Sequence, residues 1–139
     1  MEYFEATSII NAPAEKIWAA LTNAHDLQSW PSGITSLKGK IAKGEKLELQ
    51  AEAAPGRTFK LKVTQFSPNK SMTWSSGMPF GLFKGQRTYS LTPKGDQVEF
   101  KMREEFTGAM LPMIWKSIPD LNPSFKQFAN GLKSHVENN

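Results

Sequence analysis

The chain of 139 residues is 39% hydrophobic and 22% charged, which is ordinary for a globular protein and suits one domain, residues 1–139, with a core of its own. It contains no cysteine, which excludes disulfides and thiolate metal sites. This is compatible with the reducing cytoplasm, where we expect the protein. We expect neither a secretion signal nor a membrane span, since no apolar run approaches roughly 18 residues. The net charge of +4 comes mainly from scattered lysines, with only three arginines, and so favours a solvated surface over nucleic-acid binding.

The chain begins with a predicted strand and two short helices. Residues 4–10 alternate weakly between polar and apolar and end in two isoleucines, which is typical of a strand. Pro13 in the first helical position, with an acidic residue in the first turn, predicts a helix whose apolar side carries Trp18. Asn23 can then cap a second short helix that runs to Gln28.

Six stretches that alternate between apolar and polar residues follow, separated by short turns. Leu47 and Leu49 share one side of such a stretch, while Glu48 and Gln50 share the other, as expected for a strand with one buried face. The last two strands are predicted to form a long hairpin across residues 93–96. The predicted strands cover residues 34–41, 46–52, 58–66, 71–76, 82–92 and 97–106.

The chain closes with a predicted helix over residues 122–137 that carries one broad apolar face. Asn122 is expected as the N-cap, with Pro123 in the first helical position, where its missing N–H costs nothing. Such a face needs a large apolar surface to lie on, and the preceding strands can provide it. The apolar residues recur at spacings of three and four: Leu121, Phe125, Phe128, Leu132 and Val136.

The order of the elements is one strand, two short helices, six strands and one long helix. Runs of strands with helices at the ends indicate an α+β fold with an antiparallel sheet. A seven-stranded sheet that bends has one concave face, and the long helix fits there. We therefore expect a curved sheet that grips the C-terminal helix and leaves space for a ligand between them.

Residues 10–22, INAPAEKIWAALT, resemble the signature of the START-related or SRPBCC superfamily, which includes polyketide cyclases and proteins of the birch-pollen-allergen type. Similar segments are Trp30 before the first hairpin, residues 83–93, residues 105–108 and residues 125–133. The resemblance covers essentially the whole chain and implies a helix-grip fold with an apolar tunnel beside the terminal helix. Members bind lipids, sterols, polyketides or plant hormones in that tunnel, and some catalyse reactions there, so the resemblance names no single activity.

Two charged residues are expected on the inner face of the long hairpin. Alternation puts Arg87 on the same face as Phe83, and Glu104 on the same face as Phe100, so both charges point toward the core. A charge that faces the core is unfavourable unless it is paired or hydrated. In one explanation, Arg87 binds an acidic group of a ligand while Glu104 orients it or acts as a base. In the other, the two form a structural ion pair, or a bulge turns one of them outward.

Aromatic and sulfur-containing side chains complete the predicted site. Several lie in loops or short helices, and residues 77–81 and 111–115 are expected to form two lips of one ligand entrance. The alternative is a hydrophobic plug between sheet and helix, and Phe128 is assigned to the core. The predicted ligand-binding residues are Trp30, Trp74, Met78, Phe80, Phe83, Arg87, Tyr89, Met102, Glu104, Trp115 and Phe125.

No cofactor motif accompanies these residues. His25 is expected to be a solvent-facing residue at a helix cap, and His135 suits the C-terminal end of the last helix. The sequence lacks a metal-ligand cluster, a phosphate-binding loop, a dinucleotide fingerprint and a nucleophile elbow. We therefore predict neither a metal nor a cofactor.

Three functions stay open. The first is binding of a hydrophobic or amphipathic small molecule, with an acidic group near Arg87. The second is an enzyme of the polyketide cyclase or dehydratase type, in which Arg87, Glu104 or Tyr89 handles protons. The third is a protein–protein module of the chaperone-activator kind, which an exposed apolar patch in place of an enclosed tunnel would favour.

Overall fold

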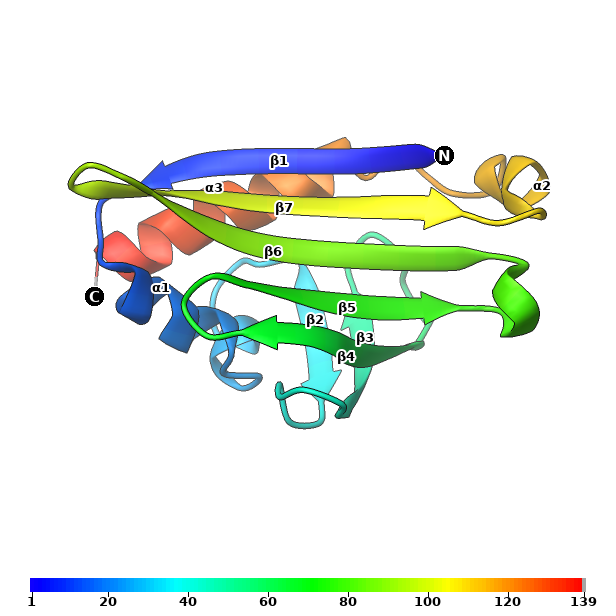
Figure 1. Ribbon diagram of the computed structural model, residues 1–139, viewed down its shortest axis with the longest axis horizontal. Coiled ribbons are helices and arrows are strands. Elements are labelled where there is room, and N and C mark those ends of the chain that lie inside the picture. Colours follow the sequence, from blue (N-terminus) through cyan, green and yellow to red (C-terminus); the bar gives the residue numbers. More distant parts are fainter. Residues whose placement is uncertain (139) are drawn as a thin grey trace.

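The computed structural model describes residues 1–138, in which seven antiparallel strands form one sheet in the order β1-β7-β6-β5-β4-β3-β2 (Figure 1). The strands are β1 (Glu2–Ile10), β2 (Ile34–Lys38), β3 (Lys46–Ala51), β4 (Phe59–Ser67), β5 (Ser71–Gly77), β6 (Lys84–Lys94) and β7 (Gln97–Thr107). The helices are α1 (Ala14–Leu21), α2 (Leu111–Trp115) and α3 (Asn122–Glu137), with the short 3₁₀ helices η1 (Asp26–Gln28) and η2 (Pro79–Gly81).

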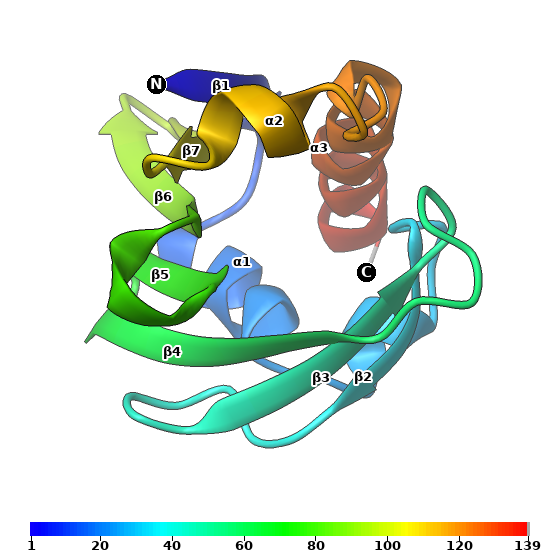
Figure 2. The same ribbon diagram turned by 90° about the vertical axis from the view of Figure 1, so that its right-hand side faces the viewer.

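The sheet curves strongly, and α3 lies on its concave side (Figure 2). In that view α3 sits between the β1 edge and the opposite wall formed by β2 and β3. Because β1 pairs with β7 rather than with β2, the two ends of the sheet are left to face each other across the helix. The predicted α+β helix-grip fold is therefore confirmed.

The long hairpin of β6 and β7 has a tighter turn than the sequence predicts. Lys94 pairs with Gln97, so only Gly95 and Asp96 lie in the loop, and Pro93 belongs to β6. Gly95 has a φ of +63°, a left-handed conformation that two-residue hairpin loops require and that glycine adopts without strain. The hairpin strands consequently run further toward the turn than expected.

The apolar face of α3 and two hydrogen bonds fix this helix to β1. Ser8 Oγ donates to the carbonyl oxygen of Ala129 at 2.9 Å, and Lys133 Nζ donates to that of Ile9 at 2.7 Å. Each large apolar side chain removed from water here contributes roughly 1.5–3 kcal/mol. The buried residues of the helix, which include most of the predicted stripe, are Phe125, Phe128, Ala129, Leu132 and Val136.

Two helix starts differ from the prediction by one residue. Leu121, not Asn122, is the N-cap of α3, and the side chain of Asp120 accepts a 3.0 Å hydrogen bond from the backbone N–H of Asn122. Pro13 is likewise the N-cap of α1 and not its first helical residue. Either position suits proline, since the first helical N–H groups have no partner within the helix. The sequence locates these helices but not their terminal residue.

Two other elements are shorter than predicted. The second helix is a single 3₁₀ turn, η1, although Asn23 does cap it: its Oδ1 accepts a 3.0 Å hydrogen bond from the backbone N–H of Asp26. β2 ends at Lys38 and does not reach residue 41. Gly39, with a φ of +115°, turns the backbone so close to the carbonyl of Lys46 that no side chain fits, and the pairing ends there.

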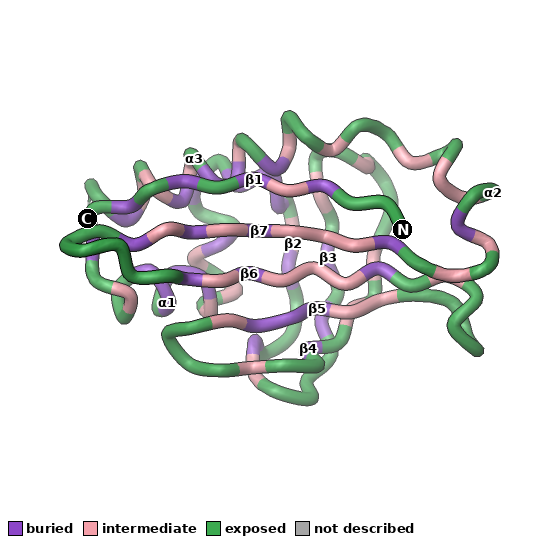
Figure 3. Tube along the Cα trace, turned by 45° about the horizontal axis from the view of Figure 1, so that its top comes forward, coloured by how far each residue is buried: buried purple, intermediate pink, exposed green. Residues whose placement is uncertain are grey.

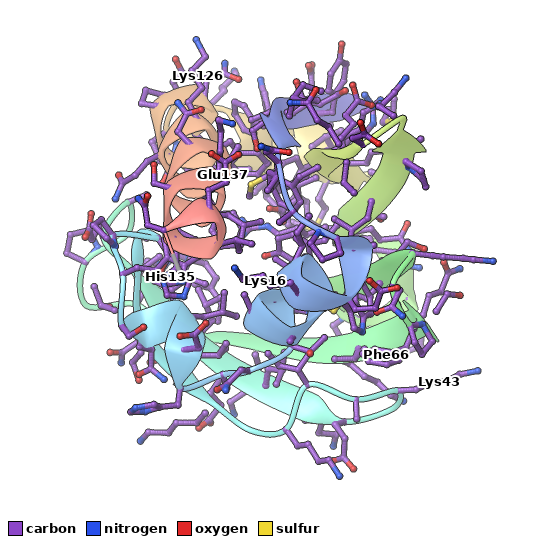
Figure 4. The ribbon with its side chains drawn as sticks, turned by 90° about the vertical axis from the view of Figure 1, so that its left-hand side faces the viewer. Lys16, Lys43, Phe66, Lys126, His135 and Glu137 are labelled. Carbon is purple, nitrogen blue, oxygen red and sulfur yellow. The ribbon has the colours of Figure 1, made fainter. Side chains whose placement is uncertain are left out.

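The last turns of α3 contact η1. His135 lies near the C-terminal end of α3, as predicted, and faces η1 (Figure 4). Its Nε2 is 3.0 Å from Oδ2 of Asp26, and its ring stacks on Trp30 with 5.6 Å between the ring centroids. His25, by contrast, is exposed beside η1, as expected for a solvent-facing residue.

Glu137 joins the end of α3 to the segment after β1. Its carboxylate accepts one 2.7 Å hydrogen bond from the backbone N–H of Asn11 and another of 2.7 Å from Lys133 Nζ. Both bonds favour the charged carboxylate and so hold the pKa of Glu137 below its ordinary value. The bond from the Asn11 N–H has the larger effect.

Buried positions alternate with less buried ones along β1, β6 and β7, as they do when one face of a sheet covers a core (Figure 3). The outward positions carry ion pairs. Arg103 Nη1 lies 2.6 Å from the carboxylate of Glu5, and Arg103 Nε lies 2.8 Å from that of Glu105. The guanidinium of Arg103 also stands 3.9 Å from the centre of the Tyr3 ring. Charges on the convex face are thus satisfied away from the core.

Candidate ligand-binding cavity

A cavity of about 260 Å³ lies between the concave side of the sheet and the N-terminal half of α3. Ser124, Phe125 and Phe128 line it from the helix. The sheet and the residue just before β6 contribute an apolar wall: Leu49, Phe59, Leu61, Trp74, Phe83, Met102 and Phe106. Because Trp74 and Phe125 both border it, the sheet and the helix are held apart at this end of the molecule.

The exposed part of the cavity wall marks its opening. On one side lie residues of the β3–β4 connection, and on the other lie residues of α2 and the segment that leads to α3. The exposed members of the wall include Ala53, Arg57, Ser117 and Pro119. The opening therefore lies between residues 53–57 and residues 114–119.

The charged part of the wall is the pair formed by Arg87 and Glu104. The two residues are direct partners across β6 and β7, and Arg87 Nε and Nη2 both donate to Glu104 Oε1, at 3.0 and 2.7 Å. Their side chains are only 22% and 13% exposed. The guanidinium also lies 5.0 Å from the centre of the Phe125 ring. Both charges point inward without a bulge, as the alternation of the strands predicts.

Arg87 stays protonated in this environment. Burial alone lowers the pKa of its guanidinium, but the charge of Glu104 and the neighbouring Tyr89 raise the pKa above its ordinary value. Arg87 uses only Oε1 of Glu104, and within residues 1–138 no hydrogen bond reaches Oε2. Gly85 leaves room for that oxygen, since a Cβ there would stand 3.1 Å from it. One oxygen of the pair is thus left for another partner.

Two polar atoms near the pair are buried: Trp74 Nε1, with which no described residue forms a hydrogen bond, and the hydroxyl of Tyr89, which lies beside the guanidinium of Arg87. The two rings meet edge to face, with 4.9 Å between their centroids. Burial raises the pKa of Tyr89, and the charge of Arg87 offsets part of that rise. The tyrosine is therefore a neutral hydroxyl beside a permanent cation.

The structure brings six of the predicted site residues to the cavity wall: Trp74, Phe83, Arg87, Met102, Glu104 and Phe125. Tyr89 is fully buried behind the wall, 5.6 Å from Phe128 between ring centroids, and Trp30 packs on the same ring at 5.3 Å. Trp115 stacks on Phe4 at 5.3 Å, outside the cavity wall. Phe128 is both buried, as expected for the core, and part of the wall.

The remaining two predicted residues point to solvent. Phe80 is 99% exposed and Met78 is 41% exposed. The backbone N–H of Met78 donates to the carbonyl of Phe83 at 2.8 Å, which closes residues 78–83 into a tight loop that turns away from the cavity. Of the two predicted lips, residues 111–115 contribute Ile114 to the wall, and residues 77–81 contribute none.

Several wall residues were not singled out from the sequence. Leu49, Phe59 and Leu61 alternate with charged residues, so the strand pattern already placed them on inner faces. Arg57 and Ile118 carried no such signal, because they lie in connections whose path is set by tertiary packing.

The curved sheet, the gripped helix and the cavity between them define a protein of the helix-grip class. A family model described as "Polyketide cyclase / dehydrase and lipid transport" matches residues 1–137, and the chain belongs to this family. The START-related resemblance of the sequence is thereby confirmed. A search of curated protein sequences found no match.

Solved structures share the fold at low sequence identity. A hypothetical protein from Helicobacter pylori has a TM-score of 0.77 at 12% identity, over 97% of this chain and 88% of its own. A norcoclaurine synthase point mutant from Thalictrum flavum, in complex with a transition-state analogue, gives 0.72 at 15% identity, over 99% and 94%. CalU16 from Micromonospora echinospora gives 0.68 at 15%, over 95% and 72%. Identities this low establish a common fold alone.

Two features are absent from the described residues. In the described part of the chain, no group of three or more His, Asp or Glu residues is arranged to hold a metal ion. No helix within residues 1–138 is both long and apolar enough to cross a membrane.

Proposed function

We propose that this protein binds a compact amphipathic small molecule in the cavity between the sheet and α3, with an anionic group of the ligand at Arg87. The observation that carries the proposal is the pair of Arg87 and Glu104, half-enclosed in a cavity wall that is largely apolar apart from this pair, Arg57 and a few serines. Ligand sites typically combine apolar walls with a few convergent polar groups in this way. The family description, which names both cyclases and lipid transport, agrees with it.

The size of the cavity limits the ligand. A volume of about 260 Å³ lies just below the range of roughly 300–1,000 Å³ that is usual for drug-sized ligands. Trp74, Phe59 and Phe125 offer ring faces and edges as contacts. A single aromatic or alicyclic ring system with one acidic group fits these limits better than a long acyl chain.

Arg87 has donors to spare for such a group. Glu104 takes one N–H from Nε and one from Nη2, and the buried hydroxyl of Tyr89 is a further acceptor beside the guanidinium. A guanidinium carries five N–H donors, so two remain beyond these partners. A carboxylate or enolate of the ligand can therefore bind Arg87 while the pair with Glu104 stays intact.

The test is a thermal melt of the full chain with a panel of aromatic acids, fatty acids, sterols and polyketide-like phenols. A ligand at a hundred times its Kd stabilises the folded state by about 2.7 kcal/mol, which raises Tm by several degrees. Arg87→Met should weaken acidic ligands selectively, whereas Arg103→Met, on the convex face, should leave their affinity unchanged. Ala51→Phe, which fills the cavity from β3, should abolish every ligand shift without lowering Tm in the absence of ligand.

Three results would count against the proposal. The first is a panel in which no compound raises Tm. The second is a ligand shift that survives Ala51→Phe. The third is equal loss of acidic ligands in Arg87→Met and Arg103→Met. The first would favour the protein–protein module, the second would place the ligand outside this cavity, and the third would exclude Arg87 as the anchor of the acidic group.

A second candidate is a reaction of the cyclase or dehydrase type in the same cavity. It is favoured by Glu104, a residue of the cavity wall whose Oε2 accepts no hydrogen bond from the described residues. Such an oxygen can accept a proton from a bound ligand while Arg87 stabilises the anion that forms. Norcoclaurine synthase from Thalictrum flavum has the same fold and has been crystallised with dopamine and hydroxybenzaldehyde.

Glu104→Gln separates the two candidates once a ligand is known. If the protein is an enzyme, this variant should still bind the ligand but lose product formation by a factor of about a hundred or more, as for other general bases. If the protein only binds the ligand, neither the parent chain nor Glu104→Gln forms a product, and the affinity for the ligand changes little.

A further inference from the structure

Exposed apolar side chains gather at one end of the molecule. The connection from β5 to β6 and the helix α2 both lie at this end (Figure 1). The strand register agrees, since Gly77 pairs with Lys84 and Lys84 pairs with Thr107. We call four of these residues the apolar tip: Met78 (41% exposed), Phe80 (99%), Leu82 (38%) and Met113 (69%).

Phe80 is the extreme member of the apolar tip. Besides being 99% exposed, it has a φ of +62°, in the left-handed region that bulky side chains avoid. A strained backbone that holds a phenylalanine in water lowers stability and solubility at once. Such a combination persists where the exposed side chain has a use.

The loop that presents Phe80 is well braced. The backbone N–H of Met78 donates to Phe83 O at 2.8 Å, and that of Met110 donates to Leu82 O at 2.9 Å, so the two segments hold each other. Gly108, with a φ of +118°, lets the α2 segment pass directly against Leu82, where no Cβ would fit. The apolar tip is therefore a fixed projection of the fold.

The two segments that carry the apolar tip contain charged side chains of one sign. Residues 77–84 and 107–119 contain two charged side chains, Lys84 and Lys116, and no acidic residue. Both lysines are exposed. Apolar side chains flanked by lysines match the surface of an anionic bilayer, where the apolar groups enter the interface and the ammonium groups meet the head groups.

The same segments border the cavity. Phe83, next to Leu82, and Ile114, next to Met113, both line its wall. Any surface that contacts the apolar tip is therefore brought close to the cavity opening at residues 114–119.

We propose that the apolar tip is a membrane-docking site that inserts Phe80, Met78 and Met113 into the interface of an anionic lipid bilayer. This goes beyond small-molecule binding and does not depend on it. A projecting side chain with almost no protein around it is suited to a soft surface, whereas docking of a second copy calls for a broad complementary face.

Vesicle co-sedimentation of the full chain tests the proposal. Binding should be strong to vesicles of phosphatidylcholine mixed with phosphatidylserine, weaker to phosphatidylcholine alone, and reduced by salt. Phe80→Ser should weaken binding by about tenfold or more, since it removes the largest inserted apolar group. Lys84→Glu with Lys116→Glu should abolish the preference for phosphatidylserine, because each lysine contributes a factor of roughly five.

The chain supplies matched controls at its opposite end. Ile9→Ser removes a side chain that is 40% exposed near the end of β1 remote from the tip, and Lys94→Glu reverses a charge at the β6–β7 turn. Neither should change vesicle binding. The proposal is overturned if the chain binds neither kind of vesicle, if Ile9→Ser weakens binding as much as Phe80→Ser, or if Phe80→Ser instead splits a dimer in size-exclusion chromatography.

Discussion

The inward-facing pair of Arg87 and Glu104 makes a sharp prediction for stability. Glu104→Gln keeps the shape of the side chain and removes its charge, so the guanidinium loses a carboxylate that it contacts at 3.0 and 2.7 Å. Breaking a fully buried pair costs about 3–5 kcal/mol. With side chains 22% and 13% exposed beside a cavity, water offsets part of this loss, so we expect about 2 kcal/mol.

Urea unfolding at neutral pH measures this loss, with Glu105→Gln as the matched control. Glu105 is the next residue on β7, pairs with Arg103 on the convex face, and has a side chain 42% exposed. Its replacement should change the free energy of unfolding by less than about 0.5 kcal/mol. The double variant Arg87→Met/Glu104→Leu should recover most of the stability, because it leaves no buried charge without a partner.

Equal losses in the two glutamine variants would refute this reasoning, since they would mean that the concave and convex pairs are equally solvated. A double variant less stable than Glu104→Gln alone would also refute it. In that case the pair would contribute net stability of its own, beyond satisfying a buried charge.

Three other perturbations test separate parts of the fold. Tyr89→Phe should reduce the loss of stability above pH 10, because the folded state, with the pKa of Tyr89 raised by burial, cannot release that proton as easily as the unfolded chain. Gly131→Ala should destabilise by about 1–3 kcal/mol in thermal melts despite the better helix propensity of alanine, since its Cβ would stand 2.8 Å from the Trp30 ring. Glu137→Gln should be less stable than the parent chain at pH 7, and the difference should vanish in acid. The pKa of Glu137 is lowered in the folded state, so this carboxylate stabilises the fold above its ordinary pKa of 4.5. That contribution is lost as the pH falls through the lowered pKa of the folded state.

The strand positions, the inward direction of Arg87 and Glu104 and the apolar face of α3 were all predictable from the sequence. Each rests on local periodicity, which depends on the two-residue repeat of a strand or the 3.6-residue repeat of a helix. The loop between residues 77 and 83 was not predictable. Its apolar composition suggested a lip of the cavity, but its backbone hydrogen bonds turn Phe80 into solvent.

The cavity opening shows the same limit. It depends on how the β3–β4 connection approaches the segment between α2 and α3, and Arg57 and Ile118, which are far apart in the chain, both line the cavity there. No short-range pattern encodes such a meeting, because it is set by the curvature of the whole sheet and the seating of the last helix.

The sequence by itself determined the order of strands and helices, which faces are apolar, and the family to which the chain belongs. The tertiary structure alone decided that sheet and helix stand far enough apart to enclose about 260 Å³, and that the tip at residues 78–82 points outward. The physical reason is that periodicity fixes the direction of each side chain relative to its own backbone. The space left between two packed elements depends on every contact that separates them.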